Sequence, residues 1–118
     1  MEATSVTVGV PVTDLRRAST WYGRVLDRQA DLEPVDGIVE FEVAGCWLQL
    51  YQGAPLAGQD FAFRIGVRDV EAQRRRLLDL GIEVGAITVI EGVIAFCDFA
   101  DPDGNGLSLY TVLSDGAR

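Results

Sequence analysis

The sequence predicts an α+β fold of two tandem βαβββ modules, which form a curved mixed sheet around a cleft with the helices on its outer face. Two observations predict this fold. A strand pattern followed by a helix pattern and further strand patterns occurs twice along the 118 residues. Short motifs in the two halves also align at similar offsets. Within a single domain, module 1 is expected over about residues 5–52 and module 2 over about residues 60–113.

The first half opens with an alternating segment in which the valines from Val6 to Val12 share one face and pack under a helix. Asp14 is suited to cap that helix, which is expected to end near residue 26 because its apolar side chains recur at helical spacing. Asp36-Gly37 and Ala44-Gly45 supply turn residues between the later strands. The strands of this half are expected over residues 5–12, 28–33, 38–44 and 46–52.

The second half repeats this order. Asp69 takes the capping position of a helix that runs to about Leu80, and Gly81 is its expected stop. The segment 12–15 aligns with 67–70 at an offset of 55, and the segment 48–51 aligns with 107–110 at an offset of 59. The strands of this half are expected over residues 61–67, 83–90, 92–99 and 106–113.

Composition narrows the classes of partner. Eighteen acidic against ten basic residues give a net charge of −8, which disfavours nucleic acid because its binding depends on neutralising phosphates. The charge is compatible with a cationic ligand entering an acidic cleft, although solubility explains it equally well. No apolar run approaches the roughly 20 residues that span a bilayer, and no secretory signal pattern opens the chain, so we expect a cytoplasmic protein without a membrane partner. Cys46 and Cys97 are expected to be reduced, buried thiols.

Three motifs resemble those of the vicinal oxygen chelate superfamily, which includes glyoxalase I, ring-cleaving dioxygenases and the bleomycin-resistance proteins. Residues 10–22 look like its opening, residues 64–72 resemble the start of its second module, and Asp101-Pro-Asp-Gly-Asn105 resembles its hallmark turn before the last strand. The resemblance implies paired βαβββ modules that usually assemble as homodimers. The residue types of the turn favour a structural role over calcium binding.

Metal-dependent members of this superfamily bind one divalent ion through four side chains, typically histidine and glutamate. Carried over by motif spacing, the four equivalent positions hold Thr7, Gln49, Ala62 and Ser108. Neutral oxygens are weak ligands of such metals, alanine offers no donor, and the chain contains no histidine. We therefore expect no metal, no other cofactor, and no metal-dependent glyoxalase or dioxygenase activity.

Strand alternation predicts which side chains face the cleft, because alternate residues point to opposite faces of a sheet. Aromatic walls with a few polar groups suit a flat organic ligand. The alternative is that these aromatic side chains fill a dimer interface or collapse the cleft. The expected ligand-binding residues are Thr7, Glu40, Trp47, Gln49, Tyr51, Arg64, Ser108 and Tyr110.

Three functions are compatible with these residues. The first is a metal-independent protein that binds or sequesters an aromatic natural product or antibiotic, which the acidic charge would allow to be cationic, in a dimeric cleft. The alternative is a metal-free isomerase or cyclase, in which Glu40, Glu42 or Asp98 acts as general base and Arg64 or a tyrosine stabilises negative charge. No paired motif assigns catalytic residues for it. The third is a regulatory or scaffold subunit without a small ligand.

Overall fold

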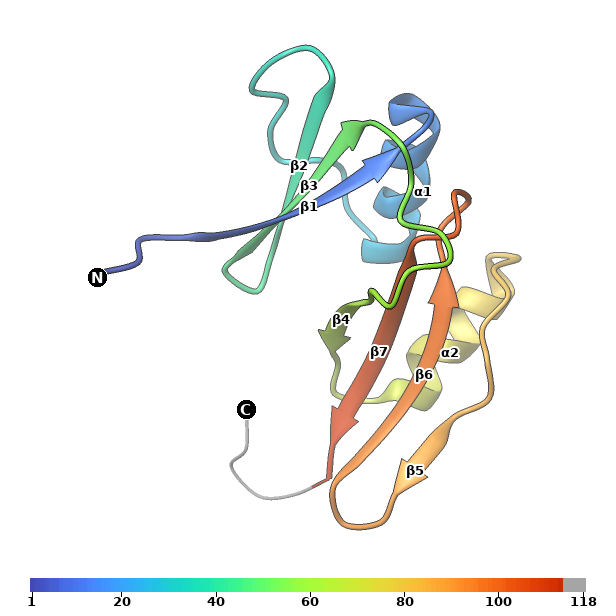
Figure 1. Cartoon of the computed structure of the whole chain (residues 1–118). Coiled ribbons are helices and arrows are strands. Elements are labelled where there is room, and N and C mark those ends of the chain that lie inside the picture. The colour runs from blue at the N-terminus through green and yellow to red at the C-terminus, as the bar shows by residue number, and fades with distance from the viewer. Residues whose placement is uncertain (114–118) are drawn as a thin grey trace. The chain divides into compact units, whose positions relative to one another are not determined.

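The computed structural model describes residues 1–113, which form two compact units (Figure 1). Among the described residues, unit 1 comprises Met1–Gly58 together with Asp101–Gly104, and unit 2 comprises Gln59–Ala100 together with residues 105–113. Each unit contains one mixed sheet and one helix, so the α+β class is confirmed. Unit 2 has the order βαβββ, and unit 1 has the same order with one strand fewer after its helix. That the two units fold as a single domain stays a prediction. Neither helix in the described part is long and apolar enough to cross a bilayer.

Unit 1 packs one helix against one face of a three-stranded sheet. Its elements are β1 (Val6–Val12), α1 (Leu15–Leu26), β2 (Ile38–Val43) and β3 (Cys46–Gln52). The strand order is β1-β3-β2, with β1 parallel and β2 antiparallel to β3. As predicted, Asp14 caps α1, and its carboxylate accepts a hydrogen bond from the backbone N–H of Arg17 at 3.1 Å. Phe41, Leu48 and Leu50 are fully buried.

The strand predicted over residues 28–33 is wrong, because only an isolated bridge between Leu32 and Glu40 forms there. Side chains take the place of a strand ladder. The Arg28 guanidinium donates to the backbone carbonyl of Glu42 at 2.9 Å, and the Asp31 carboxylate accepts from the Glu42 N–H at 2.7 Å. Arg28 and Asp31 also form an ion pair at 2.6 Å. The hydrogen bond from the Glu42 N–H holds the pKa of the Asp31 carboxyl below its usual value, and the Arg28 guanidinium lowers it further.

Unit 2 packs its helix against a four-stranded sheet. Its elements are β4 (Phe63–Gly66), α2 (Val70–Asp79), β5 (Thr88–Ile90), β6 (Ile94–Ala100) and β7 (Gly106–Val112). The strand order is β4-β7-β6-β5, and only the β4–β7 pair is parallel. Asp69 caps α2 as predicted, and Gly81 follows the helix with a φ of +83° that favours glycine. Strand β5 is shorter than predicted, because Val84 makes only an isolated bridge with Phe99.

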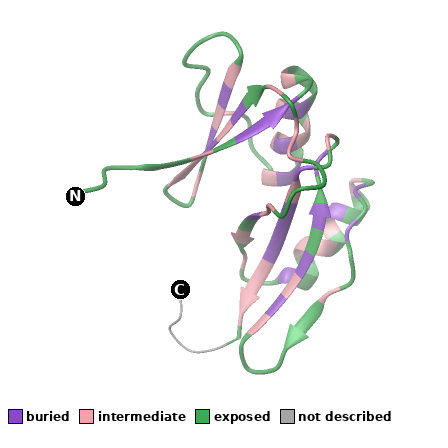
Figure 2. Cartoon of the chain, viewed as in Figure 1, coloured by how far each residue is buried: buried purple, intermediate pink, exposed green. Residues whose placement is uncertain are grey.

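Burial alternates along β2 and β3 in unit 1 and along β6 in unit 2, whereas β7 has three consecutive buried residues (Figure 2). Leu107 and Leu109 are buried beside Cys97, and burial raises the pKa of the Cys97 thiol, whereas Cys46 is only half-buried. Both cysteines are free thiols. The prediction that Val6 packs under the helix is wrong: it is 58% exposed, while Val10 and Val12 are fully buried, because only the later part of β1 lies in the core.

The Asp101–Gly104 turn belongs to unit 1, although the strands that it connects belong to unit 2. The Tyr22 hydroxyl donates a hydrogen bond to the Asp101 carboxylate at 2.9 Å, and both residues are buried. The Asp103 carboxylate accepts hydrogen bonds from the backbone N–H and the hydroxyl of Thr13. Burial raises the pKa of the Tyr22 phenol, and the negative charge of Asp101 raises it further. The phenol therefore keeps the proton that it donates to Asp101. The hallmark turn therefore has the predicted structural role.

Replacing Tyr22 by phenylalanine should lower the free energy of unfolding by about 2 kcal/mol, because the buried Asp101 carboxylate loses a charge-assisted hydrogen bond. The matched control is Tyr51→Phe, because Tyr51 is 37% exposed. This substitution should change the free energy of unfolding by no more than about 0.5 kcal/mol. Urea unfolding followed by circular dichroism measures both. Equal effects of the two substitutions would contradict a stabilising role for the bond.

Candidate functional site

Each sheet has one face covered by its helix, and we call the opposite side its open face. The open face of unit 2 carries a cavity of about 430 Å³. Its lining combines one phenylalanine, one tyrosine, two isoleucines, one serine and one arginine. The lining residues are Arg64, Ile90, Ile94, Phe96, Ser108 and Tyr110. Three of the six, namely Arg64, Ser108 and Tyr110, are among the residues predicted from the sequence.

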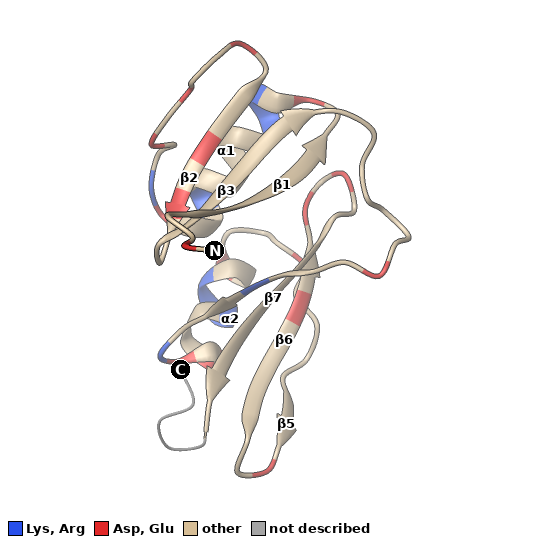
Figure 3. Cartoon of the chain, turned by 60° about the vertical axis from the view of Figure 1, so that its left-hand side comes forward, with Lys and Arg blue, Asp and Glu red and all other residues tan. Residues whose placement is uncertain are grey.

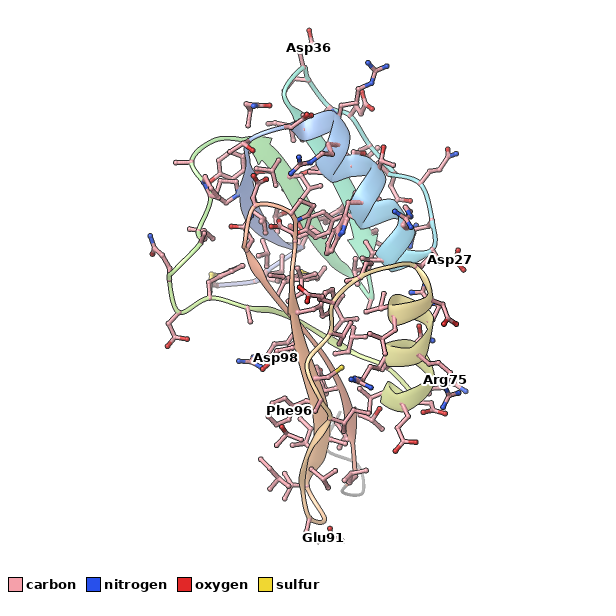
Figure 4. All side chains as sticks on the ribbon, turned by 90° about the vertical axis from the view of Figure 1, so that its right-hand side faces the viewer. Asp27, Asp36, Arg75, Glu91, Phe96 and Asp98 are labelled. Carbon is pink, nitrogen blue, oxygen red and sulfur yellow. The ribbon has the colours of Figure 1, made fainter. Side chains whose placement is uncertain are left out.

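Strand register explains why these side chains meet. Ser108 on β7 is paired with Arg64 on β4 and with Asp98 on β6. Two residues further along β7, Tyr110 is paired with Phe96. Paired residues on neighbouring strands point to the same face of a sheet. Figure 4 shows Phe96 and Asp98 on the side of β6 that faces away from α2, the helix that carries Arg75.

Tyr110 lies against Gly66, its partner on the parallel strand β4. A Cβ atom at Gly66 would lie 3.0 Å from Cζ and 3.1 Å from the hydroxyl oxygen of Tyr110. Any larger residue at this position would therefore push the tyrosine ring away from β4. The glycine lets the ring lie beside the strand and form part of the cavity wall.

Ser108 is the most unusual residue of this face. It is completely buried, and its hydroxyl oxygen has no hydrogen-bond partner among the residues that the structure describes. A buried hydroxyl without a partner costs roughly 1–3 kcal/mol, so such groups are rare in folded proteins. The neighbours Leu107 and Leu109 point into the core, which leaves Ser108 on the open face beside the cavity.

Arg64 is the charged side chain of the cavity, and it is exposed. Within residues 1–113, no hydrogen bond or ion pair joins its guanidinium to another group. Asp98 on β6 is paired with Ser108, and Figure 3 shows acidic positions on β2 and β6. A carboxylate bonded to Arg64 would have favoured the isomerase or cyclase hypothesis, which stays a prediction.

The other predicted residues share the open face of unit 1. Trp47 is paired with Thr7 and Glu42, and the next row pairs Gln49 with Glu40. The Gln49 side-chain amide donates a hydrogen bond to the Glu40 carboxylate at 3.1 Å.

Tyr51 completes this open face. Its ring lies against two glycines, since Cβ atoms built at Gly9 and Gly53 would lie 3.3 and 3.2 Å from it. The structure thus brings Thr7, Glu40, Trp47, Gln49 and Tyr51 onto one face, and their role in ligand binding stays a prediction.

The four positions equivalent to the superfamily's metal ligands offer poor donors for a divalent ion. At Thr7, Gln49 and Ser108 the side chains offer neutral oxygens, which are weak ligands of such ions, and Ala62 has no donor atom. Within residues 1–113, no three histidine, cysteine, aspartate or glutamate side chains gather into a group that could hold a metal. The donor set does not fit the metal site of the metal-dependent members of that superfamily.

Sequence reasoning missed the apolar part of the cavity. Phe96 and Ile94 alternate with buried residues on β6, as Asp98 does, so the same alternation could have identified them. Ile90 depends on the hairpin register, in which it is paired with Ile94. No local pattern in the sequence fixes that register.

Replacing Ser108 by alanine should leave the free energy of unfolding unchanged or raise it by about 1 kcal/mol, because the substitution removes an unpartnered buried hydroxyl. Thr111→Val on the same strand is the matched contrast. The Thr111 hydroxyl donates to the Val67 carbonyl at 2.9 Å and accepts from the Val70 N–H at 3.0 Å, so its loss should cost about 1–3 kcal/mol. Urea unfolding of both variants checks the sign. Destabilisation by Ser108→Ala equal to that by Thr111→Val would contradict the assignment.

Comparison with known proteins rests on structure, because no protein-family model and no curated protein sequence matches the chain. A glyoxalase / bleomycin resistance protein from Catenulispora acidiphila is 20% identical with a TM-score of 0.77, over 93% of this chain and 99% of that one. TnmS3, an antibiotic binding protein from Streptomyces sp. CB03234, is 21% identical with a TM-score of 0.78, over 94% and 97%.

The fosfomycin resistance protein FosX from Listeria monocytogenes is similar as well. It is 17% identical with a TM-score of 0.75, over 94% of this chain and 93% of that one. A lactoylglutathione lyase from Agrobacterium tumefaciens gives a TM-score of 0.76 at 17% identity, over 93% and 94%. Proteins of these kinds make up the vicinal oxygen chelate superfamily, and the chain has the fold of that superfamily.

Proposed function

We propose that this protein is a metal-independent binding protein that holds a flat aromatic small molecule, such as a natural product or an antibiotic, and thereby sequesters it. The observation that carries the proposal is the cavity of about 430 Å³ on the open face of unit 2. Its volume lies within the range of roughly 300–1,000 Å³ that is typical of small-molecule sites.

The lining favours an aromatic ligand. Phe96 and Tyr110 offer ring surfaces for stacking, and Ile90 and Ile94 offer apolar contact on the same side of the cavity. Ile90 is 50% exposed, so a bound ring would remove apolar surface from water. Similar structures include an antibiotic binding protein and resistance proteins, which supports this class of function.

Charge bears on the kind of ligand. The net charge of −8 suggested a cationic molecule, and Glu40 and Glu42 on the open face of unit 1 favour that idea. The cavity of unit 2, however, has Arg64 as its charged side chain. We therefore propose an aromatic ligand whose part inside this cavity is not cationic.

Assembly as a homodimer, which the superfamily resemblance implied, is part of the proposal. The hairpin formed by β5 and β6 favours it, because Val89, Ile90 and Val93 are each at least 50% exposed. Apolar side chains gathered in this way are typical of surfaces that contact a partner. Analytical ultracentrifugation should give twice the monomer mass of 12.8 kDa, and a monomer at micromolar concentration would contradict this part.

Binding should be measured by isothermal titration calorimetry against a panel of glycopeptide, quinone and peptide antibiotics. We expect at least one flat aromatic member to bind, and Phe96→Ala should weaken that binding about tenfold because a stacking surface is lost. The control Leu78→Ala removes an exposed apolar side chain from α2, outside the cavity lining, and should leave the affinity unchanged. No binding across the panel would refute the proposal.

Removing metal should not change this binding, because none of the four inherited ligand positions provides a carboxylate, thiolate or imidazole. The affinity measured after dialysis against EDTA should equal the affinity measured with added Mg²⁺ or Zn²⁺. A binding signal that EDTA abolishes and one of these ions restores would contradict metal independence.

A further inference from the structure

We infer that the cavity of unit 2 recognises an oxyanion on its aromatic ligand, such as a carboxylate or a phenolate, through the Ser108 hydroxyl and the Arg64 guanidinium. This inference rests on the proposed binding function and adds the polar group that the ligand must carry. It makes the ligand a flat aromatic acid.

Ser108 provides the first contact. Its hydroxyl is fully buried beside the cavity and has no hydrogen-bond partner in the described part of the chain. A hydroxyl in that state has a proton to donate, and a ligand acceptor reaches it when the cavity side chains that cover it move aside. A ligand oxygen at this point would satisfy the one buried side-chain polar atom that the described structure leaves without a partner.

Arg64 provides the charge. It is paired with Ser108 across the parallel strands β4 and β7, and paired strands lie roughly 4.8 Å apart. Both side chains can therefore reach the same group. The guanidinium is planar and binds the two oxygens of a carboxylate side by side. Because no described residue forms an ion pair with Arg64, its donors are available for a ligand.

Asp98 fixes the side on which the anion lies. It is paired with Ser108 from β6, so the serine separates it from Arg64 by two strand spacings, roughly 10 Å. Asp98 would repel an oxyanion from the β6 side, whereas Arg64 attracts it on the β4 side. Apart from Arg64 and Tyr110, the residues of the cavity lining have no titratable side chain.

The apolar end of the ligand follows from the next rows of the sheet. Tyr110 lies two residues beyond Ser108 on β7, roughly 6.6 Å away, and is paired with Phe96. Ile94 and Ile90 lie further along. An oxyanion beside Ser108 thus places the ring of a molecule of naphthoate size between the two aromatic side chains.

Three probes with the same ring test the inference: 2-naphthoate, the neutral 2-naphthalenemethanol and the cationic 2-(aminomethyl)naphthalene, titrated into the full chain by calorimetry. We expect 2-naphthoate to bind at least tenfold more tightly than the cation. Arg64→Gln should weaken 2-naphthoate about tenfold and leave the neutral probe unchanged, since hydrogen bonds to charged groups are the strong ones. Ser108→Ala should weaken 2-naphthoate at least threefold.

Arg68→Gln is the matched control, because it removes the same charge from an exposed position outside the cavity lining and should have no effect. Equal affinities for the three probes, an Arg64→Gln effect no larger than that of Arg68→Gln, or no binding of 2-naphthoate would overturn the inference. The aromatic binding function is judged separately, by the antibiotic panel and by Phe96→Ala. The two proposals can therefore fail independently of each other.

Discussion

In the part of the chain that the structure describes, one helix covers one face of each sheet, and this constraint divides every strand into two sets of side chains. One set is buried under the helix, where Leu48 and Leu50 pack in unit 1 and Leu107 and Leu109 pack in unit 2. The other set must be satisfied by solvent, by neighbouring side chains or by a partner. Because β-strand side chains alternate strictly, the sequence cannot bury both sets under a single helix. The open faces follow from this, and the cavity lies on one of them.

The two modules use equivalent positions in different ways. Gln49 and Ser108 correspond to each other in the repeat, and both lie on an open face. Gln49 is satisfied within the protein by Glu40, whereas the Ser108 hydroxyl has no partner among the described residues. A fold that tolerates an unpartnered buried hydroxyl gives up stability at that point, as binding sites commonly do. This asymmetry directs the functional proposal to unit 2.

Much of the fold could be predicted because its signals are local. Asp14 and Asp69 each precede an amphipathic helix and cap it, and the repeat places equivalent strands in both halves. The strand predicted at residues 28–33 failed for a reason that local patterns do not contain. There the backbone bonds to β2 only at Glu40, and the side chains of Arg28 and Asp31 bond to the backbone of Glu42.

Only part of the candidate site could be predicted from the sequence. Alternation identified Arg64, Ser108 and Tyr110, since each lies next to buried residues on its strand. Phe96 and Ile90 enter the cavity through the pairing of β5, β6 and β7, which depends on contacts between residues distant in sequence. That Ser108 is buried without a partner depends on all of its neighbours together, and no reading of one strand contains that fact.

The most direct test of the account is to map the binding of 2-naphthoate by ¹H–¹⁵N correlation spectra of the labelled protein. We expect the largest shift changes on the amides of Arg64, Phe96, Ser108 and Tyr110, and smaller changes around Trp47 and Gln49 in unit 1. Shift changes confined to unit 1, or scattered over both units without a maximum at the cavity, would contradict it.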